Sequence, residues 1–254
     1  SFASQVALAL ERTRLAEQAR QAHLLTETEK LQTALLNSIS HDLRTPLASI
    51  TGVLSSLHDD DALLTEAARH EMVSTAWEEA RRLNRLVGNL LDMTRLESGA
   101  LKVVRQPSDV EDLVGTSLAQ IPTRLQGRIL KVDIPLNLPL ISIDFTLMVQ
   151  VLVNLVDNAI KYTPPDKPIT IQATTLEDEV ILQVKDRGPG LPEGELEHVF
   201  DRFFRVNADG VSGTGLGLSI AKGIVEAHNG RIWAENRQNG GAAFYIALPI
   251  AHPE

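Results

Sequence analysis

The stretch from Asp144 to Tyr162 reads DFTLMVQVLVNLVDNAIKY and decides how the second half of this chain folds. Its apolar residues recur at steps of three and four, which predicts an amphipathic helix with Asp144 as N-cap. The apolar residues cover one side of that helix: Val149, Leu152, Val156 and Ile160. Three polar residues fall within about 40° of one another on the other side: Asn154, Asn158 and Lys161.

The segments around this helix alternate between strand and helix patterns. Strand-like segments lie at residues 129–134, 140–143, 169–174, 180–185, 231–235 and 243–248, and further helical segments at 109–120 and 215–229. This alternation predicts a mixed α/β layer domain.

The first half of the chain has helical patterns without strand signals. We predict one helix from Phe2 to about Leu57 and another from Glu66 to about Glu97, with Thr65 as N-cap and Gly99 as terminator. Both carry an apolar seam: Leu36, Ile39, Leu43, Leu47, Ile50, Leu54 and Leu57, then Leu83, Leu86, Leu90 and Met93. Because a lone hairpin buries one stripe only, we expect two copies to pair into a four-helix bundle. The alternative is a hairpin packed on the second domain of its own chain.

The composition limits what the chain can bind. The net charge is −9 and aromatic residues make up 4%, which argues against broad nucleic-acid surfaces. Disulfides and thiolate metal sites are excluded because there is no cysteine. No apolar run approaches the roughly 20 residues needed to cross a bilayer. Since the sequence starts at Ser1 inside a helical pattern, we expect a fragment of a longer protein.

A candidate nucleophile lies in the segment SHDLRTPL, residues 40–47. His41 and Thr45 fall about 160° from the apolar stripe of their helix, on the solvent side. Pro46 is expected to loosen the helix because it removes a backbone amide. Asp42 could orient the imidazole and accept its proton while the other ring nitrogen attacks a phosphoryl group. The alternative is a surface histidine without a chemical role.

Three segments could together form a nucleotide pocket. In DRGPG, residues 186–190, Asp186 could accept the exocyclic amine of adenine and the glycines could let the ring approach the backbone. GTGLGL, residues 213–218, opens a helix whose amides and dipole favour phosphate. The polar face of the first helix could present oxygens to Mg²⁺ and a cation to phosphates. Each segment also has an ordinary interpretation: a strand-to-turn transition, a flexible hinge and an amphipathic surface helix.

Taken in order, these segments resemble the sensor histidine kinase family. HDLRTPL (41–47) resembles its phosphoacceptor box, NLVDNAIKYT (154–163) the asparagine box, and DRGPG (186–190) the first glycine box. VFDRFFR (199–205) resembles the phenylalanine box and GTGLGL (213–218) the second glycine box. The resemblance covers about residues 30–250. It implies a dimerisation and phosphotransfer hairpin followed by a Bergerat-type (GHKL) α/β sandwich that binds ATP.

The resemblance also implies residue roles. His41 is the phosphoacceptor, Asp42 its base, and Thr45 places a water for dephosphorylating the partner. Asn158, with Asn154 beside it, holds Mg²⁺. The ATP-binding residues are Asn154, Asn158, Lys161, Tyr162, Asp186, Gly188, Gly190, Arg202, Arg205, Gly213, Thr214, Gly215, Leu216 and Gly217. One departure is the lid segment at residues 206–212, which contains no Lys or Arg. Phosphate contacts are therefore expected to rest on Lys161, Arg202 or Arg205, the metal and the glycine amides.

Residues 34–40, 90–93 and 223–228 make the chain similar to the KdpD type of potassium-responsive sensor kinase. We therefore expect ATP and Mg²⁺ as cofactors, a homodimer and a KdpE-like response regulator as partners, and no nucleic acid. The fragment is expected to be the cytoplasmic portion of a membrane-anchored sensor, without direct membrane contact. The expected domains are a signalling helix similar to the exit helix of a GAF domain at 1–30, the phosphotransfer domain at 31–99 and the ATP-binding domain at 100–254.

The expected function is autophosphorylation on His41, phosphotransfer to an aspartate of the response regulator, and dephosphorylation of that regulator, with potassium or osmotic sensing upstream. The alternatives are a nucleotide-binding dimeric scaffold, a regulator dominated by phosphatase activity, and another Bergerat ATPase such as a chaperone or topoisomerase relative.

Overall fold

The computed structural model describes residues 2, 14, 17–18, 20, 40, 43–59, 64–121, 125–206 and 215–251. They fall into two compact units, Ser1–Asn84 and Arg85–Glu254, and each is described by itself. The predictions for His41, Asp42, Gly213 and Thr214 lie outside the described residues. Within the described ranges, no helix is both long and apolar enough to cross a bilayer.

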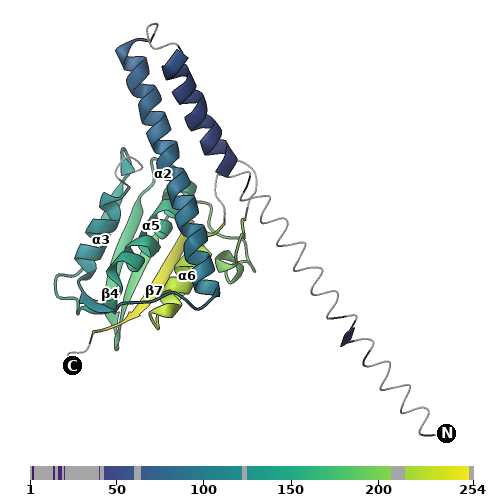
Figure 1. The fold of residues 1–254 in the computed structure, drawn as a ribbon. Helices are drawn as coiled ribbons and strands as arrows, with labels where there is room; N and C mark the ends of the chain where they lie inside the picture. The colour runs from purple at the N-terminus through teal and green to yellow at the C-terminus, as the bar shows by residue number, and fades with distance from the viewer. Residues whose placement is uncertain are drawn as a thin grey trace. The chain divides into compact units, whose positions relative to one another are not determined.

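The first unit contains the predicted helical hairpin (Figure 1). Residues 43–59 are helical, and α2 (Glu66–Glu97) begins after the turn. The hydroxyl Oγ1 of Thr65 accepts a hydrogen bond from the Ala68 N–H at 3.2 Å, which confirms Thr65 as the N-cap. Pro46 is buried and does not interrupt the helix. In the earlier part of the chain, the described residues 2, 14, 17, 18 and 20 are also helical.

Part of the predicted apolar seam is exposed in a single copy of this unit: Leu47 (54%) and Leu54 (55%). On α2, Val73 (51%) and Trp77 (65%), which were not part of the predicted seam, are also more than half exposed. Exposed apolar side chains on both helices of the hairpin are compatible with the predicted pairing of two copies.

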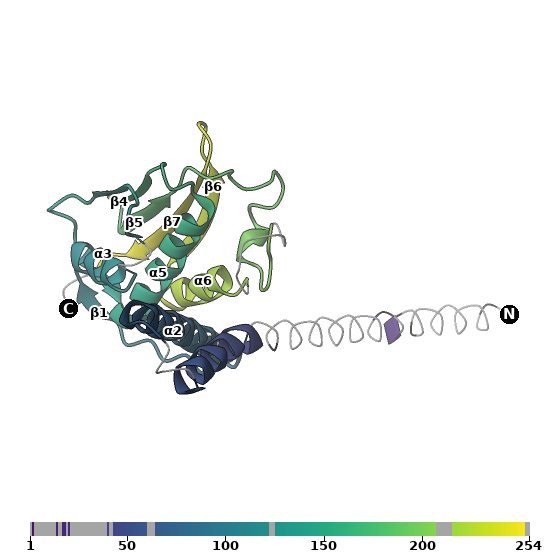
Figure 2. The ribbon, with the colours of Figure 1, turned by 90° about the horizontal axis from the view of Figure 1, so that it is seen from above.

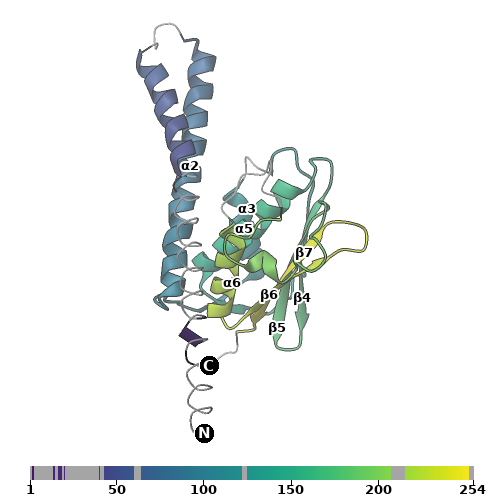
Figure 3. The ribbon, with the colours of Figure 1, turned by 90° about the vertical axis from the view of Figure 1, so that its right-hand side faces the viewer.

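The second unit contains a five-stranded mixed sheet of order β2-β4-β5-β7-β6 (Figures 1 and 2). The strands are β2 (Leu130–Asp133), β4 (Ile169–Leu176), β5 (Glu179–Lys185), β6 (Arg231–Asn236) and β7 (Ala242–Pro249). Only β2 and β4 pair in parallel. Helices α3 (Val110–Ala119), α5 (Phe145–Tyr162) and α6 (Gly217–Ala227) cover one face of the sheet (Figure 3). The predicted α/β layer domain is therefore confirmed.

Three short elements complete the described part of this unit. The predicted strand at 140–143 is observed as β3 (Ile141–Ile143), but it pairs antiparallel with β1 (Gln106–Ser108) rather than joining the large sheet. The pattern around Pro107 had not predicted β1. A single 3₁₀ turn, η2 (His198–Phe200), precedes the loop that leads to α6.

Helix α5 lies at the centre of the core. The carboxylate of Asp144 accepts from the Leu147 N–H at 3.3 Å, which confirms the predicted N-cap. The apolar side predicted for α5 is buried, and Met148, Leu152 and Leu155 are each 0% exposed. Burial of one such side chain stabilises a fold by about 1.5–3 kcal/mol. The buried side therefore fixes α5 and leaves its polar face available.

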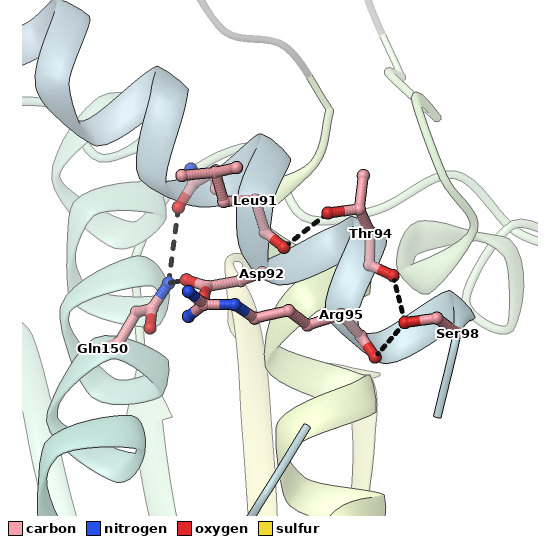
Figure 4. A network of polar contacts seen from close by, with 7 residues as sticks. Leu91, Asp92, Thr94, Arg95, Ser98 and Gln150 are labelled. Atoms are coloured by element: carbon pink, nitrogen blue, oxygen red, sulfur yellow. Dashed lines mark hydrogen bonds and ion pairs between the residues drawn. The ribbon is translucent and has the colours of Figure 1, made fainter. Parts of the chain in front are cut away.

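The last turns of α2 pack on the α/β domain within the second unit (Figure 4). The amide Nε2 of Gln150 in α5 donates to Asp92 Oδ2 at 2.7 Å and to Asn89 Oδ1 at 3.5 Å. A Cβ placed on Gly223 of α6 would lie 2.8 Å from the Leu96 side chain, so glycine lets Leu96 sit directly on α6.

The segment after α2 is tied to the same domain. Gly99 ends the helix with φ +64, as predicted. The Val104 N–H donates to Asp144 Oδ2 at 3.1 Å, and Arg105 donates to the Ala227 carbonyl at 2.8 Å. Residues 104 and 105 are therefore anchored at the start of α5 and the end of α6.

His228 joins the ends of these two helices inside the core, where it is 0% exposed. Its Nε2 accepts from the Asp144 N–H at 2.9 Å, and its Nδ1 donates to the Ile224 carbonyl at 2.7 Å. A backbone N–H can only donate and a carbonyl can only accept, so the pair of bonds requires the neutral ring. Burial lowers the pKa of His228, and the Arg105 guanidinium lowers it further, against the Ile224 hydrogen bond and Asp144.

We expect the free energy of unfolding to decrease as the pH falls below 6.5, the ordinary pKa of histidine. Below that pH the unfolded chain takes up a proton at His228 that the folded chain does not bind, which favours unfolding. His228→Asn should reduce this pH dependence, measured by urea denaturation at pH 7.5 and 5.5. Exposed His198 has a raised pKa and therefore changes the free energy of unfolding with pH in the opposite direction. Because His198 is present in both the wild type and the variant, it does not affect the comparison. An identical pH dependence in the variant would contradict the assignment.

Candidate functional site

Asp186 is a buried carboxylate at the end of β5, with 4% of its surface exposed. Its Oδ1 accepts from the Gly188 N–H at 2.8 Å and the Ala242 N–H at 3.0 Å. Burial raises the pKa of Asp186, while the two amides and the Arg237 guanidinium oppose the shift. Both hydrogen bonds end on Oδ1, which leaves Oδ2 to accept from an external N–H.

The first glycine of DRGPG meets the end of α5. A Cβ on Gly188 would lie 2.5 Å from the Tyr162 carbonyl oxygen, closer than any real Cβ contact. The structure therefore requires glycine at position 188 because of its packing against Tyr162, whereas the prediction invoked the approach of an adenine ring. Tyr162 itself has 42% of its surface exposed.

The polar face of α5 carries the predicted asparagines and lysine. The Asn154 side chain donates from Nδ2 to the Gly217 carbonyl at 3.3 Å, which brings α5 against the first residue of α6. Asn158 lies one turn further on and is half-buried. The ammonium of Lys161 lies 3.1 Å from the Asp157 carboxylate. Lys161 therefore has an ion-pair partner that the sequence analysis did not name.

This face fits Mg²⁺ only in combination with phosphate oxygens. No cluster of three or more His, Cys, Asp or Glu suited to a metal occurs among the residues that the structure describes. Mg²⁺ takes oxygen ligands and commonly shares them with substrate phosphates. With Nδ2 of Asn154 bonded to Gly217, its Oδ1 remains as the acceptor. The donor set of Asn154 and Asn158 is thus compatible with Mg²⁺ held jointly with a nucleotide.

The second glycine segment and the phenylalanine segment lie together. The Phe203 N–H donates to the Gly215 carbonyl at 3.1 Å. Gly215 has φ +70, and a Cβ there would lie 2.7 Å from the Phe203 carbonyl carbon, so the turn requires glycine. Leu216 is buried and α6 begins at Gly217.

Arg202 and Arg205 are exposed residues near this turn. Arg202 lines a cavity of about 430 Å³ at the end of α2, together with Met93, Leu96, Phe200, Asp201, Ser219, Ile220, Lys222, Gly223 and Glu226. Asp186, Asn154 and Asn158 do not line it. Arg202, a predicted phosphate contact, therefore shares a cavity with residues of α2 and α6 and with none of the predicted adenine or Mg²⁺ residues.

Thr45 is exposed on the helix of residues 43–59, one residue before buried Pro46. Its solvent-facing position agrees with the predicted geometry. The neighbouring pair His41 and Asp42 falls outside the described part of the chain.

Two family models match the chain. That of the His Kinase A (phospho-acceptor) domain matches residues 31–99, and that of the histidine kinase-, DNA gyrase B- and HSP90-like ATPases matches residues 143–252. The solved catalytic domain of histidine kinase ThkA is 30% identical, with a TM-score of 0.52 over 59% of this chain and 97% of that chain. The chain belongs to the histidine kinase family.

Two further relatives extend the comparison. Sensor protein KdpD of Escherichia coli K12 is 39% identical to this histidine kinase over 251 residues, which are 98% of this chain and 28% of KdpD. The chain therefore spans less than a third of the length of that relative. Full-length ShkA in complex with AMPPNP is 26% identical, with a TM-score of 0.63, over 86% of this chain and 46% of ShkA.

The structure of this histidine kinase also shows supporting residues that the sequence analysis missed. Arg128 donates to the carbonyls of Thr163 and Ile160, the latter at 2.8 Å, and so caps the C-terminus of α5. Arg237 donates to the Asp186 carbonyl at 2.6 Å. Their partners lie more than 30 residues away in sequence, so no local pattern could have indicated them.

Proposed function

We propose that this histidine kinase phosphorylates itself on His41 with ATP and passes the phosphoryl group to an aspartate of a response regulator. The observation that carries the proposal is Asp186, a buried carboxylate whose Oδ1 is bonded to two amides and whose Oδ2 can accept from a base. The match to ATPases over residues 143–252, and the AMPPNP held by the similar ShkA, support adenine nucleotide as the ligand.

In this proposal the base and the phosphates contact different elements of the second unit. The exocyclic amine of adenine donates to Asp186 Oδ2, and the phosphates extend toward the polar face of α5 and the turn before α6. The amide oxygens of Asn154 and Asn158 would hold Mg²⁺, which neutralises phosphate charge when bound. Lys161 must share or leave Asp157 to meet a phosphate, since the two lie 3.1 Å apart.

The chemical step is an in-line transfer. A ring nitrogen of His41 forms a bond to the γ-phosphorus while the bond from that phosphorus to the bridging oxygen of ADP breaks. Asp42, next to His41 in the sequence, accepts the imidazole proton and fixes the ring. The phosphoryl group then passes to an aspartate of the response regulator.

His41 and Asp186 belong to different proposed domains, 31–99 and 100–254, so the ATP-binding domain must approach the phosphotransfer domain in the catalytic cycle. We expect a hinge between these domains near residues 97–108, of which residues 104 and 105 are bonded to the α/β domain. We therefore place the hinge at residues 98–103.

The partners follow from the same proposal. The exposed apolar side chains Leu47, Leu54, Val73 and Trp77 support pairing of two copies into a four-helix bundle. Similarity to KdpD supports a KdpE-like response regulator, potassium or osmotic input and a membrane-anchored whole protein. We retain signalling, phosphotransfer and ATP-binding domains at 1–30, 31–99 and 100–254.

The proposal is tested by incubating the protein with Mg²⁺ and ATP labelled in the γ-phosphate. We expect label that is lost in acid and stable in base, as a phosphorus–nitrogen bond requires. Label stable in acid and lost in base would assign the phosphate to another residue type. Calorimetric heat from Mg²⁺-ATP without any label would identify a nucleotide-binding scaffold instead, and the absence of both would refute the ATP site.

Thr45→Ala should separate phosphatase from kinase activity. Removing the hydroxyl that places the attacking water should slow dephosphorylation of the response regulator by at least about tenfold, while autophosphorylation stays within about twofold of the wild type. The measurement is the half-life of the phosphorylated regulator with each variant. Thr51→Ala is the matched control, because Thr51 is exposed on the same helix and bonds its own Leu47 carbonyl at 2.8 Å. Equal half-lives for both variants would remove Thr45 from this role.

A further inference from the structure

Asn236, the last residue of β6, bonds the far end of the DRGPG loop through both polar atoms of its amide. Its Oδ1 accepts from the Leu191 N–H at 2.8 Å, and its Nδ2 donates to the Leu191 carbonyl at 2.7 Å. The Asn236 side chain thereby bonds both the N–H and the carbonyl of Leu191, as the backbone of a neighbouring strand would.

The loop fits closely around this amide. A Cβ on Gly190 would lie 2.9 Å from Asn236 Oδ1, so a larger residue at position 190 would displace the side chain. Asn236 is itself exposed to solvent, and β6 is an edge strand of the sheet. Its two hydrogen bonds therefore act on the loop rather than on the core.

The beginning of the same loop is held by the same hairpin, β6–β7 (Figure 2). The Ala242 N–H donates to Asp186 Oδ1 at 3.0 Å, and Arg237 donates to the Asp186 carbonyl at 2.6 Å. Gly188, in the middle of the loop, donates to the same Oδ1 at 2.8 Å. The position of the loop backbone therefore sets the direction in which Asp186 Oδ2 points.

We propose that Asn236 is a positioning residue for base recognition. By fixing Leu191 and Gly190, it holds the Gly188 amide on Oδ1 and keeps Oδ2 aimed at the exocyclic amine of a purine. Asn236 touches no nucleotide atom in this scheme and acts through Asp186. The inference rests on the proposed function, in which Asp186 contacts adenine.

The test compares ATP with ITP, whose base carries a carbonyl oxygen in place of the amine. Affinities for both nucleotides are measured by calorimetry with Mg²⁺ on the whole chain, for the wild type, Asn236→Ala and Gln238→Ala. Gln238 is exposed in the same hairpin and is the matched control. We expect Asn236→Ala to lose affinity for ATP by on the order of tenfold and for ITP by much less, so that the ATP-to-ITP preference falls by about the same factor. Gln238→Ala should keep the wild-type preference.

A second variant, Asn236→Asp, guards against a folding defect. It is nearly isosteric and can still accept from the Leu191 N–H, but it cannot donate to the Leu191 carbonyl. We expect a reduced ATP-to-ITP preference in this variant too. A general loss of structure would weaken both nucleotides equally and would overturn the inference. If both Asn236 variants keep the wild-type ATP-to-ITP preference, the inference is also overturned. The proposed contact of Asp186 with adenine would stand in that case. A wild type that binds ATP and ITP equally would instead overturn the adenine contact, and the inference with it.

Discussion

Replacing His41 with glutamine should abolish incorporation of the γ-phosphate of ATP, to below about 0.1% of the wild-type rate, because the variant would lack the proposed nucleophile that forms the new bond. Glutamine keeps a polar side chain of similar size but has no basic ring nitrogen. The measurement is transfer of label from ATP to protein in a single-turnover time course.

Two controls define this result. Calorimetry should show unchanged ATP binding in His41→Gln, since the nucleotide residues belong to the other compact unit. His58→Gln, at an exposed position of the helix of residues 43–59, should incorporate label as the wild type does. Label retained by His41→Gln would assign the phosphoacceptor to another residue.

Asp186→Asn should weaken ATP binding by about 100-fold, because the NH₂ of the asparagine and the amine of adenine are both hydrogen-bond donors and would face each other in a buried site. The Gly188 and Ala242 amides require an acceptor at the Oδ1 position, so the asparagine must point its carbonyl there and its NH₂ where Oδ2 was. That NH₂ opposes the amine of adenine but can donate to the carbonyl of hypoxanthine. The variant should therefore prefer ITP over ATP, in a calorimetric comparison of the two nucleotides.

The same substitution should not destabilise the fold. Because burial raises the pKa of Asp186, the ionised carboxylate favours the unfolded state at neutral pH, and a neutral asparagine removes that cost. The midpoint of urea unfolding is the control, and it should be equal to or higher than that of the wild type. Wild-type affinity for ATP in a folded Asp186→Asn protein would exclude Asp186 from base recognition.

The local elements of the fold could be predicted because their signals are local. The N-caps Asp144 and Thr65 and the buried side of α5 each follow from residues within one or two turns. The Lys161–Asp157 ion pair also had a local signal, a spacing of four in a helix, which the sequence analysis overlooked.

The supports of the candidate site could not be predicted in the same way. Asn236 reaches Leu191 across 45 residues, and Arg128 reaches the end of α5 across 32 or more. A lone asparagine or arginine in a loop has no pattern that identifies such a partner. The pairing of β3 with β1 was missed for a related reason, because three-residue strands carry almost no periodicity.

The hydrogen bond between Gln150 and Asp92 and the close packing of Leu96 on Gly223 restrain the movement of the α/β domain. These contacts hold the last turns of α2 on α5 and α6 within the second unit. A swing of the α/β domain about residues 98–103 would first have to break these contacts. A hydrogen bond to a carboxylate and one apolar contact are together worth about 2–4 kcal/mol, so the detached form would occupy on the order of 1% of molecules or less at rest. A rotation of α2 that weakens these two contacts would raise the fraction of molecules with a detached α/β domain. The rate of autophosphorylation would rise in proportion.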